Sequence, residues 1–266
     1  MLIYPEKIAQ YLEGDANYLN ATLTLGLIFT LSLISVFYYY IIGEKMKFLL
    51  WLVVSYLLLM TLFQFSARGV LLFPPAIAIL LLPFIGRKNI IKSAILFLLI
   101  CFIISIAISL FLENSSGYTL YHMQRLFEST EEESRFDVWS KSIYIISENF
   151  WFILGGGLNA FMEELHLYPH NFFLQLIGEY GIIGIIWIYF FILISFRFIK
   201  GNLFLRHEHN EIMNYYVIGG FLYYFCTFSK SFSLYDTLPL LIYFMFCVVL
   251  SDKYCLREQY DKCIIL

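Results

Sequence analysis

Four side chains in this sequence stand where they could do chemistry: Arg68, Arg135, His170 and Glu179. An arginine is always charged and can bind a phosphate through two parallel hydrogen bonds. A histidine can accept a proton near neutral pH, and one that precedes a helix also lies where anions bind. Taken singly, each has a plainer interpretation. A lone arginine is typical of a membrane-surface anchor or a solvated charge, and a lone histidine of a helix cap.

The sequence offers little for metal chemistry. Glu163 and His166 have the spacing of a helical metal pair, but no second such pair occurs. The five cysteines include no Cys-x-x-Cys pair, which argues against metal or redox use. We therefore expect no metal and no other cofactor, and we interpret the His-Glu-His stretch at 207–209 as solvated.

The composition excludes several classes of protein. Hydrophobic residues make up 61% of the 266 residues and charged residues only 14%, against about 25% charged in soluble domains. This excludes a soluble globular enzyme and a disordered chain. The net charge of −3 shows no basic surplus, so a nucleic-acid binder is excluded as well. The lipid bilayer is the expected surrounding.

Seven charge-poor stretches approach the length that crosses a bilayer, which takes about 20 apolar residues. They are 16–43, 48–67, 69–86, 93–112, 180–196, 212–229 and 237–251. We expect the fifth helix to begin earlier, near Asn171, and the Pro74–Pro75 pair suggests a break in the third. Strands are excluded because an open sheet edge cannot lie in hydrocarbon. The sequence thus predicts an all-α polytopic membrane bundle of about seven transmembrane helices, a single membrane domain over 1–266.

The distribution of Lys and Arg predicts the orientation of these helices. If the odd-numbered helices end in the cytoplasm, that side holds eleven of the 17 Lys and Arg residues and the far side holds six. The N-terminus is then outside and the C-terminus cytoplasmic. Residues 1–15 lack the features of a signal peptide. An outside N-terminus without a signal leads us to expect further helices upstream of Met1.

Residues 113–171 form the one long connection, on the outer side. Nine acids and three bases give this loop a formal charge of −6, so an anionic ligand needs arginines aimed at it. Ser134 can cap a helix that begins at Arg135, and a second short helix is expected near 159–165. The apolar positions of the first helix recur at helical spacing: Phe136, Trp139, Ile143, Ile146 and Phe150. Such a helix would lie flat on the membrane surface or on the top of the bundle.

The fifth span carries Gly178, Gly181 and Gly184 on one stripe, which lets another helix approach closely. Glu179 lies about two turns inside this span, where an acid is costly and indicates function or pairing. In the second case it pairs with an arginine of the loop. The sequence leaves both alternatives open.

Four segments now stand in order: SARG at 66–69, SRFDVW at 134–139, LGGGLNAF at 154–161 and PHNFFLQLIGEYGIIG at 169–184. Together they resemble the O-antigen ligase and O-antigen polymerase superfamily of bacterial membrane glycosyltransferases. The family's loop pattern reads S-R…W, then L-G-x-G, then H-N-x-x-L-Q-x-x-x-E-x-G-x-x-G. The DANYL segment at 15–19 also resembles a family segment. One departure is Ala67, where the family commonly has serine before the arginine.

The resemblance runs from about residue 13 to the last helix and corresponds to the C-terminal part of the family's usual architecture. It implies a GT-C-like helical bundle with an ordered helical extracytoplasmic loop at 113–171. It also implies the bacterial inner membrane, with this loop in the periplasm. Several helices would then precede Met1.

Members of this family transfer a glycan from a polyprenyl diphosphate carrier to a hydroxyl acceptor during surface polysaccharide assembly, without a metal. The acceptor can be another glycan or lipid A-core, so ligase and polymerase remain equally open. By resemblance, Arg68 and Arg135 clamp the diphosphate and His170 acts as a general base or a phosphate contact. Asn171 and Glu179 complete the expected substrate-binding set. From the residues alone, Trp139 or Tyr168 could stack on a sugar, and the sequence does not choose between them.

Two other functions compete with this one. The first is a non-enzymatic polytopic transporter or flippase component, which would be expected to show inverted repeats and broken helices near the membrane midplane. The second is an inactive, truncated remnant of the enzyme, which the expected loss of upstream helices suggests.

Overall fold

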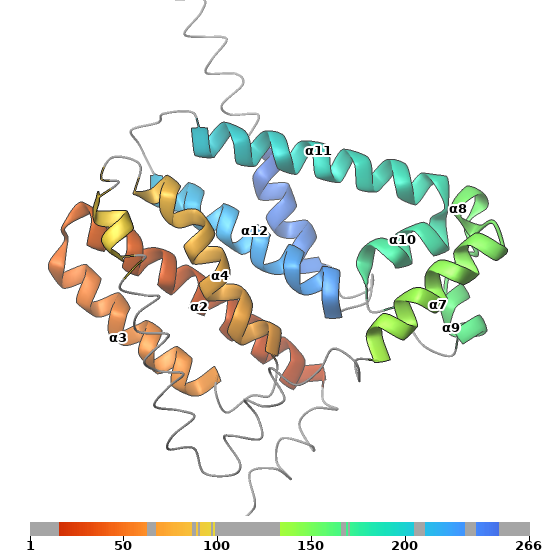
Figure 1. Cartoon of the computed structure of the whole chain (residues 1–266), viewed down its shortest axis with the longest axis horizontal. Coiled ribbons are helices and arrows are strands. Elements are labelled where there is room, and N and C mark those ends of the chain that lie inside the picture. Colours follow the sequence, from red (N-terminus) through yellow and green to blue (C-terminus); the bar gives the residue numbers. More distant parts are fainter. Residues whose placement is uncertain are drawn as a thin grey trace, which may run out of the picture. The chain divides into compact units, whose positions relative to one another are not determined.

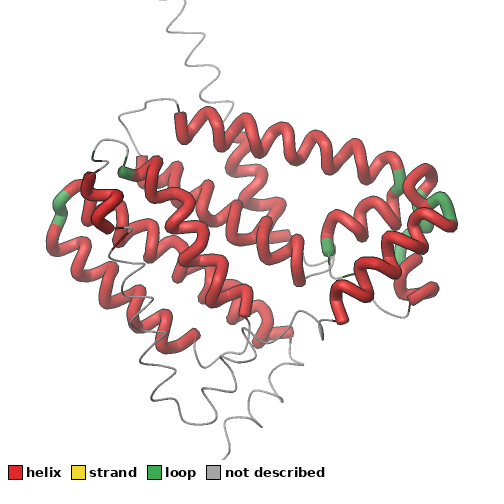
Figure 2. The backbone as a smooth tube through the Cα atoms, viewed as in Figure 1, coloured by secondary structure: helices red, strands yellow, loops and turns green. Residues whose placement is uncertain are grey.

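A computed structural model of the chain describes residues 16–62, 68–86, 89, 91–96, 98, 134–165, 169, 171–204, 211–231 and 238–249. Every regular element among these residues is a helix (Figure 2), as the sequence predicts. The helices fall into two compact units, residues 1–130 and 131–266. The single membrane domain over 1–266 stays a prediction.

Among the residues that the structure describes, the first unit contains α2 (Ala16–Ile42), α3 (Lys45–Leu62), α4 (Arg68–Ile85) and a short helical stretch at 91–96. Helix α2 packs against both α3 and α4 (Figure 1). A tight turn joins α2 to α3, and Gly43 has a φ of +92° in it. Such a value favours glycine, which has no Cβ. The amides of Gly43 and Glu44 both donate to the carbonyl of Tyr39, at 3.0 and 3.1 Å. This carbonyl in the last turn of α2 thus has its hydrogen-bond partners.

Small hydroxyl side chains lie between the helices of this unit. Thr30, Ser32 and Ser35 of α2 are fully buried. The Ser55 hydroxyl of α3 donates to the Ser32 hydroxyl at 3.0 Å, and Thr30 donates to the carbonyl of Gly26 at 2.9 Å. Small residues let helices approach closely in an apolar environment, and their hydroxyls then need such partners.

Helix α4 runs unbroken from Arg68 to Ile85 although it contains Pro74 and Pro75. The break suggested by this pair is therefore absent. Proline removes an amide that would bond the carbonyl four residues earlier, but a helix packed among neighbours tolerates that loss. Its start is packed against the rest of the unit through Val70, which lies in a buried cluster with Phe29 and Leu62.

The described residues of the second unit form six labelled helices and one more near the end of the described part. They are α7 (Ser134–Glu148), α8 (Trp151–Leu154), α9 (Ala160–Leu165), α10 (Phe172–Tyr180), α11 (Ile182–Phe204), α12 (Glu211–Ser231) and the helix Leu238–Val249. The two predicted loop helices are thus present as α7 and α9. The predicted apolar face of α7 is buried only in part: Ile146 is buried and Trp139 half-buried, but Phe136 and Ile143 are more than half exposed. Ser142, which is not on the predicted face, is fully buried. The small Ser142 side chain suits the close packing of α7 on its neighbours α8 and α10.

The predicted fifth span contains two helices, α10 and α11, in place of the single helix expected from Asn171 onward. Helix α10 ends at Gly181, whose φ of 58° and ψ of −131° are not helical, and α11 starts at the next residue. The two helices pack on each other. Gly184 makes this close contact possible, because any residue with a Cβ at that position would collide with the carbonyl of Leu176. The glycines at 178, 181 and 184 do allow close contacts, as predicted, but the neighbour at Gly184 is α10, which was predicted to be part of the same helix.

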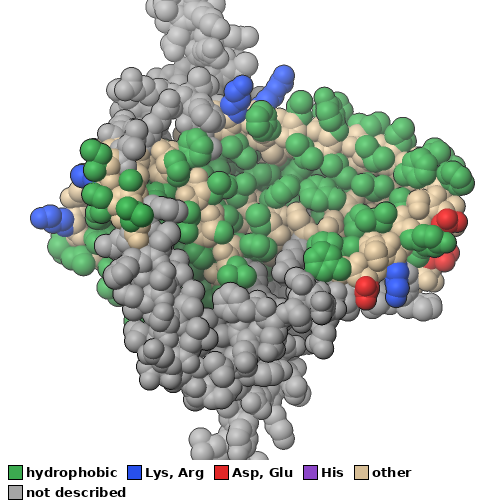
Figure 3. All heavy atoms as spheres, viewed as in Figure 1, with side chains coloured by type: hydrophobic (Ala, Val, Ile, Leu, Met, Phe, Trp, Pro, Cys, Tyr) green, Lys and Arg blue, Asp and Glu red, His purple; other side chains and the backbone are tan. Residues whose placement is uncertain are grey.

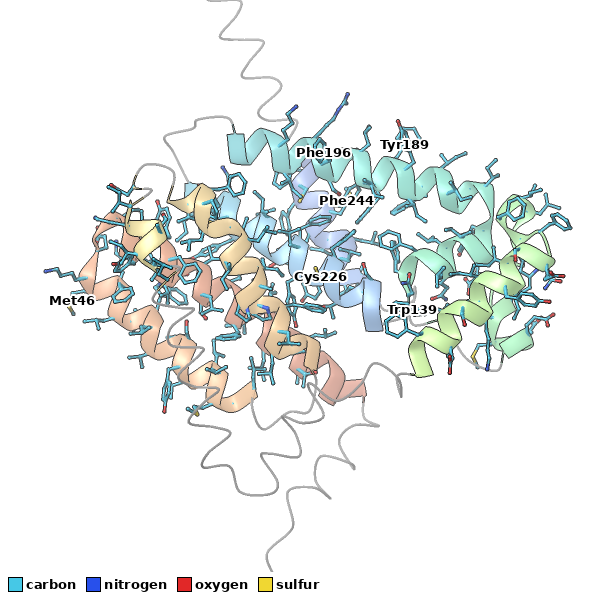
Figure 4. The ribbon with its side chains drawn as sticks, in the orientation of Figure 1. Met46, Trp139, Tyr189, Phe196, Cys226 and Phe244 are labelled. Carbon is cyan, nitrogen blue, oxygen red and sulfur yellow. The ribbon has the colours of Figure 1, made fainter. Side chains whose placement is uncertain are left out.

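A cluster of aromatic rings holds the long helices of the second unit together. The Phe191 ring of α11 lies 6.1 Å from the Phe172 ring of α10 and 5.7 Å from the Phe221 ring of α12, centroid to centroid. It also stacks at 4.6 Å on Phe244 (labelled in Figure 4), which belongs to the helix Leu238–Val249. Such ring contacts add to the burial of large apolar surfaces, and they fix α10 against α11 and α12.

Three described helical segments are long and apolar enough to cross a membrane: Ala21–Ile42, Lys45–Leu62 and Ile182–Lys200. Val70–Ile85 and Leu238–Val249 are apolar but shorter. Many side chains on α3 and α11 face outward; Tyr189, for example, is 60% exposed and points away from its unit (Figure 4). Exposed apolar side chains on long helices are what a lipid-facing surface requires.

Replacing Gly181 by alanine should lower the stability of the protein more than replacing Gly157 by alanine. Both residues have positive φ, at 58° and 90°, which costs an L-residue about 1–2 kcal/mol. A Cβ at Gly181 would also meet the amide nitrogen of Gly155 and the carbonyl of Ile153, whereas a Cβ at Gly157 has open space. Thermal unfolding of both variants in detergent measures the difference. Equal midpoints would show that close packing does not restrict position 181.

Candidate functional site

The candidate site is built around α10, the short helix that follows position 170. Asn171 caps its beginning, since the Oδ1 atom accepts hydrogen bonds from the amides of Phe173 and Leu174 at 3.0 and 3.1 Å. An asparagine at this position satisfies amides that have no partner within the helix. The Nδ2 atom of Asn171 donates to the carbonyl of Ser229 in α12 at 2.9 Å. One side chain thus both starts α10 and ties it to α12.

The glycine-rich loop closes the other end of α10. In an uninterrupted helix the carbonyls of Gly178 and Glu179 would accept from amides four residues later, but the break at Gly181 removes those partners. The amides of Gly156 and Gly157 replace them, donating to the Gly178 and Glu179 carbonyls at 2.7 and 3.1 Å. The loop glycines therefore act as a cap supplied from another part of the chain.

Only glycine fits at the points of closest approach. Gly155 has a φ of +78°, and a Cβ there would collide with the backbone of Glu179. On the opposite side, a Cβ at Gly178 would strike the ring of Phe161, which is fully buried. Gly155 is thus required by the contact between the loop and α10, and Gly178 by the contact between α10 and the ring of Phe161.

Glu179 lies inside this assembly. Its side chain is only 3% exposed, and one carboxylate oxygen accepts a hydrogen bond from the amide of Gln175 at 3.0 Å. Gln175 is itself completely buried and one turn earlier on α10. A buried carboxylate is costly unless hydrogen bonds compensate it, so the pair depends on both members. Gln175 was not among the residues predicted for the site, although its four-residue spacing from Glu179 could have indicated it.

The chain on both sides of position 170 is held in place. The indole nitrogen of Trp139 in α7 (labelled in Figure 4) donates to the carbonyl of Pro169 at 2.7 Å. Asn171 on the other side is bonded to α12 as described above. The indole N–H is therefore engaged in positioning the backbone, a role that the sequence did not indicate for Trp139.

The three residues expected to be catalytic are placed only in part. Arg68 is the first residue of α4 in the first unit, and Arg135 lies in the first turn of α7 in the second. Their side chains, and the whole of His170, lie outside the described residues. Within the described ranges, no group of three His, Cys, Asp or Glu side chains could hold a metal ion.

The comparison with protein families identifies the chain. The family model described as O-antigen ligase matches residues 52–189, which is 138 of 266 residues and just over half of the chain. The chain therefore belongs to the O-antigen ligase family, as the motifs indicated. The match spans Arg68, Arg135 and the whole of α7–α10. Comparisons with curated proteins and with solved structures give no match. The family and the three long apolar helices together make this a membrane protein of the ligase and polymerase type.

Replacing Asn171 by aspartate and by alanine should separate its two structural roles. Aspartate keeps an oxygen that caps α10 but cannot donate to the Ser229 carbonyl, whereas alanine loses both interactions. We expect the alanine variant to lose about 1–2 kcal/mol of stability and the aspartate variant to keep slow hydrogen exchange at the amides of Phe173 and Leu174. Thermal unfolding and hydrogen–deuterium exchange measure the two effects.

The exposed Asn149 at the end of α7 supplies the control, because Asn149→Ala removes an amide of the same kind outside this helix. Fast exchange at positions 173 and 174 in the Asn171→Asp variant would contradict the capping role.

Proposed function

We propose that this protein transfers a glycan from a polyprenyl diphosphate carrier to a hydroxyl acceptor during surface polysaccharide assembly. Family membership supports the general class of reaction. The observation that carries the proposal is the anchoring of the chain around position 170, by the Trp139 indole on one side and by Asn171 on the other. A catalytic group needs such fixed backbone on both sides to stay oriented toward its substrate.

Helix register supports a site that includes both Arg135 and position 170. Positions 135 and 139 are four residues apart in α7 and therefore lie on one face, one turn from each other. Trp139 reaches Pro169 from this face, next to His170 in the chain. We infer that Arg135 and His170 act on one substrate, with Arg68 of the first unit as the third participant.

In this reaction the acceptor oxygen forms a bond to the anomeric carbon while the bond from that carbon to the diphosphate oxygen breaks. The hydroxyl proton passes to a base, and the carrier diphosphate leaves with the negative charge. Arg68 and Arg135 would stabilise that charge through paired hydrogen bonds. The proposal needs neither a metal nor another cofactor.

The capping of α10 bears on the role of His170. A helix N-terminus can bind phosphate through its free amides, but the amides of Phe173 and Leu174 already donate to Asn171. The amide of Gln175 donates to the Asn171 carbonyl at 3.0 Å. With these donors engaged, anion binding by α10 is weakened, which favours His170 as the base that accepts the hydroxyl proton.

Burial bears on the role of Glu179 in a similar way. A carboxylate that is 3% exposed and bonded to Gln175 is poorly placed to touch a substrate. We propose that Glu179 stabilises the contact between the loop and α10 instead of binding the glycan. Asn171, whose two polar atoms hold α10 and α12, is likewise proposed to position His170.

The broken fifth span does not favour a transporter. Transporters place discontinuous helices near the membrane midplane, whereas the break at Gly181 directly precedes the candidate span Ile182–Lys200. It thus lies at one end of that span.

We expect Arg135→Ala and His170→Ala each to reduce glycan assembly by about a hundredfold or more, because each removes charge stabilisation or proton transfer that acts in the transition state. Arg68→Ala should do the same. The measurement is the ladder of surface glycan on a gel, from a host whose own gene is deleted and complemented with each variant. Immunoblots of the membrane fraction establish equal insertion.

Lys141→Ala is the matched control, since it removes an exposed cation from the same helix. Normal ladders from both Arg135→Ala and His170→Ala would refute the enzyme, and a host that regains no ladder with the unaltered chain would indicate an inactive remnant. His170→Lys distinguishes the two roles of the histidine. It should keep partial activity if position 170 binds phosphate and lose activity if it accepts the proton.

We further propose seven membrane spans in the bacterial inner membrane, with residues 113–171 in the periplasm and the C-terminus in the cytoplasm. Glu163 is exposed, so a Glu163→Cys variant should react with a membrane-impermeant maleimide in intact spheroplasts, above the background of the unaltered chain. Labelling that requires lysis would reverse the orientation.

A further inference from the structure

The short helix α8 presents apolar side chains outward at the edge of the loop. Phe152, Ile153 and Leu154 are 39%, 48% and 88% exposed, and Phe150 before them is 64% exposed. These four residues are called the α8 patch below. Trp151 between them turns inward, where its ring meets the Phe161 ring edge to face at 5.5 Å. One side of α8 is therefore built into the loop while the other remains uncovered within the second unit.

The turn into α8 holds one of these side chains outward at a cost. Phe150 adopts the left-handed conformation, with φ 54° and ψ 29°. For a residue with a Cβ this costs about 1–2 kcal/mol, and for a bulky side chain it is unusual. The ring is not buried in return, since it lies at the surface 6.0 Å from the Phe152 ring. Burial against something outside this unit would offset that cost.

The position of α8 indicates which partner could bury the α8 patch. Helix α8 packs against α11, at the point where Gly181 approaches the carbonyl of Ile153. The candidate membrane span starts at the next residue, Ile182, and Ile182 and Ile183 are 54% and 67% exposed. The α8 patch thus continues the outward apolar surface of α11, and Figure 3 shows hydrophobic side chains over both helices.

The charges of the loop fit the same partner. The sequence carries no charged residue between Glu148 and Glu163, a stretch that includes all of α8. The exposed Glu148, Glu163 and Glu164 lie on either side of it along the chain. An apolar, aromatic segment bordered by charges is the pattern of a structure at the boundary between headgroups and acyl chains.

We propose that the α8 patch inserts into the membrane leaflet at the N-terminal end of α11, with bilayer lipid as its partner. It would hold the glycine-rich loop at the membrane surface. The C-terminal end of α10, which this loop caps, would lie at the same height. This is a lipid-contact site in addition to the spanning helices, and it does not depend on glycan transfer.

Photo-crosslinking tests the proposal on the full chain. The photoreactive residue p-azidophenylalanine replaces Leu154 in one variant and Phe152 in another. Each protein is reconstituted into vesicles of phosphatidylethanolamine and phosphatidylglycerol whose acyl chains are labelled. The same replacement at Tyr189, exposed on α11, is the lipid-facing control. At Glu163, exposed on α9, it is the control outside the patch.

We expect lipid labelling at 152 and 154 to equal that at 189 and to exceed that at 163 several-fold. Labelling at 152 and 154 no greater than at 163 would overturn the proposal, as would crosslinks to a second copy of the chain in place of lipid. Leu154 is so exposed that its replacement leaves packing intact, and a thermal unfolding midpoint equal to that of the unaltered chain verifies this.

Discussion

The candidate site depends on how the backbone of α10 is satisfied after the helix breaks at Gly181. Two carbonyls lose their helical partners there, and in a poorly hydrated environment such a loss is costly. The amides of Gly156 and Gly157 compensate for it at 2.7 and 3.1 Å. The loop must therefore approach α10 so closely that a Cβ at Gly155 would collide with the backbone of Glu179, and this requirement places the loop relative to the helix.

The same short helix is held at its beginning and along its side. Asn171 joins it to α12, and Phe172 packs into the aromatic cluster around Phe191. The indole of Trp139 in α7 holds Pro169, three residues before α10 begins. A nine-residue helix has little stability of its own, so its position results from these tertiary contacts. A rigid α10 next to position 170 is what the proposed chemistry needs.

Much of the fold could be predicted from the sequence, because long charge-free stretches have few alternatives to helices. The predicted stretches 16–43 and 69–86 match α2 and α4 within about two residues. The break at Gly181 could not be predicted, since glycine is compatible with both a helix and a turn. The buried face of α7 could be predicted only in part, since Ile146 is buried but the helix also packs through Ser142 and leaves Phe136 exposed. For the site, local patterns indicated Asn171 and Glu179, but their partners in α12 and the loop are distant in sequence.

The hydroxyl pair of the first unit has a consequence for a residue far from it. Two helices joined only by leucines could slide or rotate past one another at little cost. A one-residue slip of α3 along α2 would separate Ser55 from Ser32 and leave the Ser55 hydroxyl without this acceptor in an apolar setting, whereas Ser32 would keep its bond to the carbonyl of Phe29. The pair thus fixes the register of α3 against α2. The cluster of Phe29, Leu62 and Val70 lies one turn before Ser32 on α2 and connects both helices to the first turn of α4. The position of Arg68, the first residue of α4, therefore depends in part on Ser32 and Ser55, which have no role in the proposed reaction.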